Sequence, residues 1–385
     1  MSVSIDLPAR DGARRRVELR PAPSGDTRGA PFQKRIAFAA AHVTVDALAE
    51  SEPALAPVID WETTLAYRRY LWSLGFAVAE AMDTAQRGGG LSWQNARELI
   101  VRGSAEAKAC GGRIACGVGT DQLSPGANID SVIAAYEEQL AVTESSGSQA
   151  ILMASRALAA CARGPEDYDR VYGRLLRQSS RPVILHWLGE MFDPQLAGYW
   201  GSRNVEQAMS TCLAIIAEHR DKVDGIKISL LDKNREIEMR RRLPDGVHMY
   251  TGDDFHYDEL IAGDDHGYSH ALLGIFDAIA PVAAAALRAF DSGDVVKYRD
   301  LLAPTVPLSR HIFRAPTYAY KTGVVFLAYL NGHQNHFRML GGQESARSLL
   351  HLCDLLSLAS NAGLLRDPSL AARRMKPLLD LGGFA

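Results

Sequence analysis

The chain has 385 residues, of which 47% are hydrophobic and 23% are charged, an ordinary composition for a globular protein with a substantial core. Its formal net charge of -3 excludes the large basic field that nucleic-acid binding requires. No apolar run is long enough to span a membrane, the N-terminus lacks a signal-peptide pattern, and the five cysteines lack paired spacing. We therefore expect a cytoplasmic protein with reduced thiols, without nucleic-acid or membrane partners, that acts on a small molecule.

Residues 1–33 are predicted to form a β-hairpin followed by a linker. Residues 3–7 and 16–20 alternate between apolar and polar side chains on either side of an Asp11-Gly12 turn signal. Residues 21–31 are rich in Pro, Gly and Ser, as linkers are. We expect the hairpin to lie outside the main fold.

From residue 35 onwards, short apolar runs alternate with helical patterns. The apolar runs lie at 35–43, 75–82, 113–119, 150–153, 182–186, 223–229, 247–250 and 267–273. Helix starts are indicated by Asp60, Ser92, Pro165 and Asn204, and helical patterns cover 129–144 and 233–242. Continuous apolar strands are typical of parallel sheets covered on both faces. Eight such alternations predict a (β/α)8 TIM barrel over residues 34–291 rather than a doubly wound sheet.

Residues 292–385 are predicted to form a C-terminal helical extension. Helical periodicity begins at 279–290, at the end of the predicted barrel, and continues over 295–312, 318–330 and 346–359. This is more helix than closing a barrel requires. We expect the extension to cover the barrel mouth, to form a subunit surface, or both.

Lys227 is the most informative single residue, because it is a cation inside the apolar run 223–229. Burying a charged amine costs free energy, and desolvation favours the neutral amine, which attacks carbonyl groups. The alternative is a strand-end lysine that reaches solvent or pairs with an aspartate.

The other strand ends supply groups that move protons or bind hydroxyls, and working residues of such barrels lie at the C-terminal ends of the strands. His186 and Asp83 are the further predicted catalytic residues. The predicted substrate-binding residues are Thr84, Glu80, Ser155, Arg156, Ser229, Asp253, Asp254 and His270.

A metal site is the alternative to this interpretation. Asp253, Asp254, His256, His186 and Glu190 are suitable ligand types, but their spacing matches no metal-binding motif. The glycine-rich stretches 88–90 and 117–119 lack the other features of nucleotide-binding loops. We therefore predict no metal and no other cofactor.

Two motifs stand out, Gly225-Ile-Lys-Ile-Ser229 and Tyr250-Thr-Gly-Asp-Asp254. They resemble motifs of the dihydrodipicolinate synthase / N-acetylneuraminate lyase superfamily. Gly225-Ile-Lys-Ile-Ser229 is similar to the family's Gly-Ile-Lys context of the Schiff-base lysine on strand six. Tyr250-Thr-Gly-Asp-Asp254 is similar to its turn after strand seven, and weaker similarity extends from residue 35 to residue 290. The resemblance implies a class I aldolase-like barrel in which Lys227 forms the imine.

The chain also departs from that family at two places. Where the family holds the carboxylate of pyruvate with paired hydroxyls, residues 81–87 offer Thr84 and an aspartate, Asp83. Because an aspartate repels a carboxylate, we expect pyruvate to bind poorly. The family's strand-four tyrosine, a proton shuttle, is missing near 154–157, and His186 is the expected replacement because an imidazole titrates near neutral pH.

Together these observations predict a divergent lyase or aldolase of carbohydrate metabolism. Lys227 would form a Schiff base with a hydroxylated carbonyl compound, a keto-sugar or keto-acid, and a C–C or C–O bond would break. The alternatives are a metal-dependent sugar isomerase or epimerase and a sugar-binding barrel without catalysis. The resemblance and the large apolar C-terminal part favour a homo-oligomer.

Overall fold

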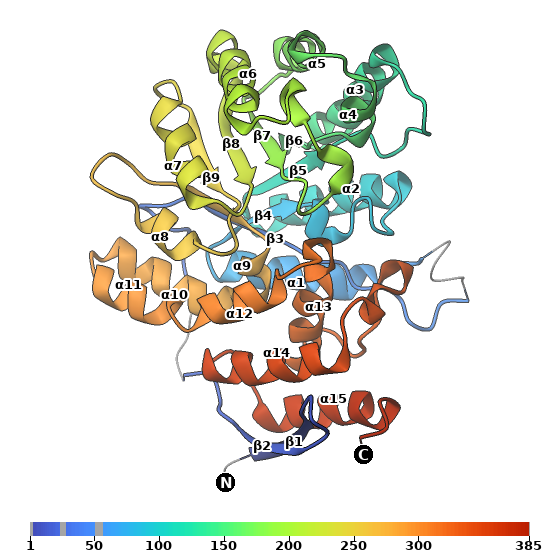
Figure 1. Cartoon of the computed structure of the whole chain (residues 1–385), viewed down its shortest axis with the longest axis vertical. Coiled ribbons are helices and arrows are strands. Elements are labelled where there is room, and N and C mark those ends of the chain that lie inside the picture. The colour runs from blue at the N-terminus through green and yellow to red at the C-terminus, as the bar shows by residue number, and fades with distance from the viewer. Residues whose placement is uncertain (1–2, 24–27, 51–56, 385) are drawn as a thin grey trace.

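The computed structural model describes residues 3–23, 28–50 and 57–384, and it confirms the predicted (β/α)8 barrel. Eight parallel strands close in the order β10-β3-β4-β5-β6-β7-β8-β9, so neighbours in the chain are neighbours in the barrel (Figure 1). The strands are β3 (Ala37–Ala40), β4 (Ala77–Glu80), β5 (Ile114–Val118), β6 (Gln149–Leu152), β7 (Val183–Leu188), β8 (Val223–Ser229), β9 (His248–Thr251) and β10 (His270–Leu273).

Helices follow the strands and begin where the sequence indicates. The side chains of Asp60, Ser92 and Asn204 each accept a hydrogen bond from a backbone N–H of the first helical turn, which fixes those starts. The helices are α1 (Trp61–Ser73), α2 (Trp93–Cys110), α3 (Ile129–Ser145), α4 (Arg156–Cys161), α5 (Pro165–Gln178), α6 (Val205–Glu218), α7 (Lys233–Arg242), α8 (Tyr257–Ala262), α9 (Ile275–Ala278) and α10 (Ala280–Asp291). Among the residues described, no helix is long and apolar enough to cross a membrane.

The barrel interior is a packed core rather than a channel. Phe38, Ile151, Ile184, Tyr250 and Leu272 are buried together inside it. Such packing leaves room for ligands only at the strand ends.

The C-terminal part contains α11 (Val295–Leu302), α12 (Thr305–Ile312), α13 (Tyr320–Leu330), α14 (Leu349–Asn361) and α15 (Pro368–Leu381). The prediction of one helix over 295–312 is wrong. Pro304 separates α11 from α12, because proline lacks the N–H that would continue the helical hydrogen bonds and its ring crowds the preceding turn.

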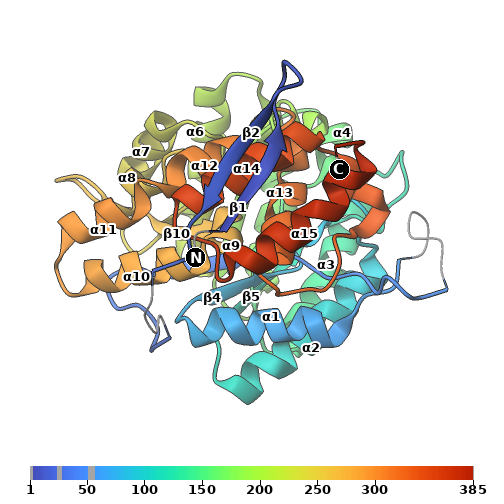
Figure 2. The ribbon, with the colours of Figure 1, turned by 90° about the horizontal axis from the view of Figure 1, so that it is seen from below.

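The N-terminal hairpin is formed by β1 (Val3–Pro8) and β2 (Arg14–Leu19), which pair antiparallel as predicted. It lies outside the barrel, as expected, but it is packed against the C-terminal helices. The hairpin packs across α14 and α15 (Figure 2), Leu7 and Leu19 are buried, and Arg20 N donates a 2.8 Å hydrogen bond to Ser360 Oγ. The linker predicted over 21–31 lies partly outside the described residues.

Candidate active site

Lys227 lies on β8, the sixth strand of the barrel, and reaches a small cavity at the C-terminal ends of the strands. Only 7% of the residue is exposed. Burial lowers the pKa of Lys227, while the carboxylates of Asp83 and Asp254 act in the opposite direction. Within the described part of the chain, no hydrogen bond or ion pair holds its amine. The lysine therefore faces a cavity, and not a salt bridge.

Gly252, in the turn after β9, leaves room for this lysine. A Cβ atom at that position would overlap Ser229 Oγ first, and it would also lie 2.6 Å from Ile228 O and 2.7 Å from Lys227 Cε. Real Cβ atoms do not approach other atoms so closely, so a larger residue here would displace Lys227 or the strand beside it.

The two aspartates of the same turn have different surroundings. Asp253 accepts hydrogen bonds from Phe255 N at 2.8 Å and from His256 Nδ1 at 2.9 Å, so it holds the start of α8 and does not line the cavity. Asp254 lines the cavity beside Lys227. Burial raises the pKa of Asp254 to about 7, although the N–H of Ile275 and the charge of Lys227 oppose that shift. Asp254 is thus suited to give or take a proton near neutral pH.

Asp83 and Thr84 open the short helical turn η1 (Asp83–Ala85) that follows β4, and both line the cavity of Lys227. The carboxylate of Asp83 interacts electrostatically with Lys227 and with Lys321. Thr84 Oγ1 lies 2.9 Å from the hydroxyl of Tyr320. Both residues of this turn therefore lie at the cavity of Lys227, and their contact with a substrate stays a prediction.

Tyr320 and Lys321 were missed by sequence reasoning. Both come from the first turn of α13, in the C-terminal extension, and both are buried. Tyr320 lines the cavity of Lys227 and stacks on Phe313 with ring centroids 4.3 Å apart. Burial, reinforced by Asp83, raises the pKa of Tyr320 well above its usual value, so the phenol stays protonated. The sequence feature that could have identified them is a Tyr-Lys pair at the start of a largely apolar helix.

His186 lies inside the barrel on β7, opposite Lys227 in the strand register. Its Nε2 is 3.4 Å from Ser229 Oγ, and its Nδ1 finds no partner among the described residues. Burial and the charge of Lys227 lower the pKa of His186 well below its usual value. The expectation that this imidazole titrates near neutral pH is wrong, and it is a neutral neighbour of Lys227.

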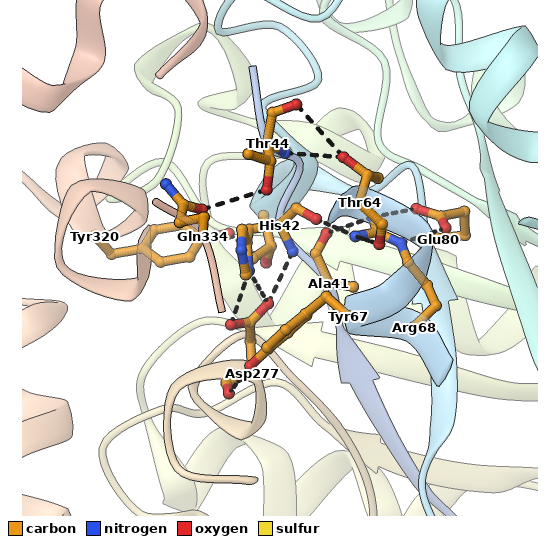
Figure 3. Close-up of polar contacts among 11 residues, drawn as sticks. Ala41, His42, Thr44, Thr64, Tyr67, Arg68, Glu80, Asp277, Tyr320 and Gln334 are labelled. Atoms are coloured by element: carbon orange, nitrogen blue, oxygen red, sulfur yellow. Dashed lines mark hydrogen bonds and ion pairs between the residues drawn. The ribbon is translucent and has the colours of Figure 1, made fainter. Parts of the chain in front are cut away.

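Glu80 and His270, like Asp253 and His186, do not line the cavity of Lys227. Glu80 is fully buried in a two-pronged ion pair with Arg68 of α1, with both N–O distances 2.9 Å, close to the buried pair of His42 and Asp277 (Figure 3). His270 is the first residue of β10, at the opposite end of the barrel, where its Nδ1 accepts a hydrogen bond from Ile36 N at 3.0 Å. Neither is available to a substrate at the barrel mouth.

A second, larger cavity of about 460 Å³ opens next to the first. Asp83 and Leu188 line both cavities, so the two are neighbours. The predicted residues Ser155 and Arg156 line this outer cavity. Ser155 Oγ lies 2.5 Å from Thr120 Oγ1, and Arg156 forms an ion pair with Asp193.

Comparison with known proteins places the chain in a family. Residues 5–384 match the family described as "Protein of unknown function (DUF993)". The chain belongs to this family. Among curated proteins, none gives a match.

Solved structures show what this DUF993 chain is similar to in fold. Dihydrodipicolinate synthase from Aquifex aeolicus is 14% identical with a TM-score of 0.65, and the match covers 86% of this chain and 99% of that one. The enzyme from Bacteroides thetaiotaomicron is 15% identical with a TM-score of 0.64 and the same coverage. YagE, a prophage protein from E. coli K12 solved in complex with pyruvate, is 12% identical with a TM-score of 0.64, again with 86% and 99% covered. The predicted resemblance is thus confirmed for the fold.

The five residues of suitable ligand type, Glu190 among them, form no metal-ligand group in the described part of the chain. Asp253 and His256 bond to each other, whereas Asp254 and His186 lie on separate sides of Lys227's strand, after β9 and on β7. Across the described ranges, no three His, Cys, Asp or Glu side chains are grouped as metal ligands would be.

Proposed function

We propose that this protein is a Schiff-base-forming lyase or aldolase that acts on a hydroxylated carbonyl compound. The observation that carries the proposal is the placement of Lys227, a buried amine that faces a cavity together with proton-transfer groups. The fold, shared with dihydrodipicolinate synthases, is compatible with this chemistry and does not by itself establish it.

The first step requires a neutral amine. An unperturbed lysine has a pKa near 10.4, so less than about a thousandth of such side chains is neutral at pH 7. Burial of Lys227 lowers its pKa and so enlarges the neutral fraction. Nζ then attacks the carbonyl carbon, and loss of water gives an imine. Once protonated, the imine accepts the electron pair of a neighbouring C–C or C–O bond as that bond breaks.

Proton transfer in this scheme falls to two groups that border the same cavity. Asp254, with its pKa of about 7, takes the proton from a substrate hydroxyl or carbon. Tyr320 donates through its hydroxyl, which Thr84 orients. Tyr320 thus takes the role first expected of His186.

Trapping of the imine tests the proposal. Borohydride reduces an imine to a stable amine, so the intact protein should gain the mass of a carbonyl compound from a panel of ketoses and aldehydes. Lys227→Arg keeps the positive charge but stays protonated, so it should show no adduct and lose turnover by several orders of magnitude.

Lys321→Arg is the matched control, since Lys321 is also buried with a pKa lowered by burial. Adducts should persist in this variant and map to the peptide that contains Lys227. An adduct on Lys321, or a Lys227→Arg enzyme that keeps a tenth or more of wild-type turnover, would show the imine mechanism to be wrong.

A further inference from the structure

We infer that the outer cavity binds the uncharged, hydroxylated chain of the substrate, and that Asp83 excludes substrates with a carboxylate or phosphate there. The inference rests on the proposed function, because it takes the substrate carbonyl to lie at Lys227. It narrows the substrate from any hydroxylated carbonyl compound to one with a neutral polyol chain.

The two cavities form one path for an extended molecule. A carbonyl group at Lys227 occupies the small inner cavity, which has little room for more. The rest of the molecule must pass Asp83 and Leu188, which line both cavities, to enter the outer one. At about 460 Å³ the outer cavity is within the usual range for small-molecule sites.

The arginines that line the outer cavity are already engaged by carboxylates. Arg87 Nε donates to Asp121 at 2.9 Å, and its other nitrogens donate to Gln139 Oε1 at 2.8 Å and to Gly117 O at 3.1 Å. Arg156 is paired with Asp193. An anionic substrate could use the guanidinium of Arg87 only by displacing Asp121. The pair of Arg156 and Asp193 is formed through Nε of the arginine, so the charge of Asp193 offsets that of Arg156, although the outer nitrogens of Arg156 stay accessible.

Asp83 differs from these paired aspartates. Its carboxylate has no hydrogen bond from any described residue, although Lys227 and Lys321 interact with it electrostatically. With Asp83 counted, three aspartates and two arginines line the outer cavity, a formal net charge of -1. A carboxylate or phosphate placed there would meet like charge, whereas a hydroxyl would donate to Asp83.

The rest of the lining suits a polyol. Thr120 and Ser155 present a pair of hydroxyls that both donate and accept. Leu123, Leu196 and Met153 offer apolar surface for the C–H faces of a carbon chain.

Carbonyl compounds that differ in charge test the inference, and erythrulose and its 4-phosphate form the pair with the same carbon skeleton. Erythrulose, erythrulose 4-phosphate and pyruvate are each titrated with cyanoborohydride present, and the half-saturating concentration for the adduct on Lys227 is measured. In the wild type, we expect erythrulose to reach half-saturation at a concentration at least ten times lower than either anion. In Asp83→Asn, this preference should shrink several-fold, mainly through better trapping of the phosphate.

Asp130→Asn is the control for net charge, because Asp130 is 78% exposed and lies away from both cavities. It should keep the wild-type preference. Trapping of the phosphate or of pyruvate as readily as erythrulose by the wild type would overturn the inference while leaving the imine mechanism intact. An unchanged preference for erythrulose in Asp83→Asn would show that Asp83 does not exclude the anions. If no carbonyl compound forms an adduct on Lys227, both the proposed function and this inference fail.

Discussion

Gly252 and Lys227 contact each other closely at the residue scale, since a Cβ at position 252 would lie 2.7 Å from Lys227 Cε. We expect Gly252→Ala to displace the lysine and slow imine trapping at least tenfold, with a lower midpoint of thermal unfolding. Gly89→Ala is the control, because there the nearest atoms belong to the flexible amide of Gln343. Wild-type trapping in Gly252→Ala would contradict the close contact as the reason for this glycine.

Tyr320 and Thr84 form a second pair, joined by a 2.9 Å hydrogen bond between their hydroxyls. Tyr320→Phe removes the proton donor but not the amine. We expect turnover to fall by about 10²- to 10⁴-fold while imine trapping persists, because general acid–base groups contribute on that scale. Exchange of substrate C–H for deuterium should fall in parallel. In Tyr318→Phe, whose tyrosine is 53% exposed, both should stay unchanged. Full turnover in Tyr320→Phe would exclude the tyrosine from proton transfer.

Glu236 gives a prediction for stability. Burial raises its pKa to about 8, although hydroxyls of Ser269 and Thr251 donate to its carboxylate. Between its ordinary pKa of 4.5 and about 8, the unfolded chain ionises this group while the folded protein keeps the proton. The contribution of Glu236 to the free energy of unfolding should therefore be greatest below pH 4.5. It should be lost as the pH rises through 8.

Urea denaturation across pH 5 to 8 measures this dependence. Glu236→Gln should flatten the decline, and Glu218→Gln, at a side chain that is 63% exposed, should not. Part of the decline should remain in Glu236→Gln, because the pKa of Asp254 is also raised. An equal slope in wild type and Glu236→Gln would mean that Glu236 titrates normally.

Site residues could be predicted where their own neighbours in the sequence reveal them, but not where their role depends on a partner far away in the chain. Lys227 was found from its own apolar surroundings, and Lys321 stands in similar ones within α13. Nothing local relates Tyr320 to Thr84, which lies 236 residues earlier. His270 was misplaced because strand ends are poorly fixed by sequence, and β10 begins at that residue.

At the scale of elements, the buried ion pair of Arg68 and Glu80 ties α1 to β4. Glu80→Gln would leave the guanidinium buried without its counter-charge. We expect a loss of about 3–5 kcal/mol in the free energy of unfolding, with the activity of the folded fraction kept, because Glu80 lines neither cavity. Glu98→Gln, which breaks an exposed pair with Arg102, should cost less than about 1 kcal/mol. If folded Glu80→Gln protein lost its activity, Glu80 would have a role in the active site after all.

The sequence predicted the barrel strands well, whereas the C-terminal helices were mispredicted at their prolines. The barrel strands were found because continuous apolar runs are distinctive. Pro304 was overlooked as a break between α11 and α12. In the opposite direction, α15 was not predicted although it forms a helix, and it contains Pro377 in its interior, where proline usually ends a helix. A tertiary contact with α13 and β1 supports it nonetheless.

At the scale of the whole molecule, the N-terminal hairpin and the C-terminal helices stabilise each other. Leu7 is fully buried in the same core as residues of α13, α14 and α15. We expect Leu7→Ala to lower the free energy of unfolding by about 2–5 kcal/mol, as other buried leucines do when truncated. Chemical denaturation measures it, and Leu48→Ala, at a side chain that is 94% exposed, is the control. A change within error for Leu7→Ala would restore the hairpin to the status of a separate appendage.

The contact between the two ends of the chain also sets the order in which the protein can be completed on the ribosome. The hairpin is synthesised before the helices on which it packs, and Ser360, which binds Arg20, follows 340 residues later. Leu7 and Leu19 therefore stay uncovered for most of synthesis, when exposed apolar surface favours aggregation. Tyr320 also arrives after every barrel strand, so a nascent chain would hold the amine of Lys227 before it holds the phenol.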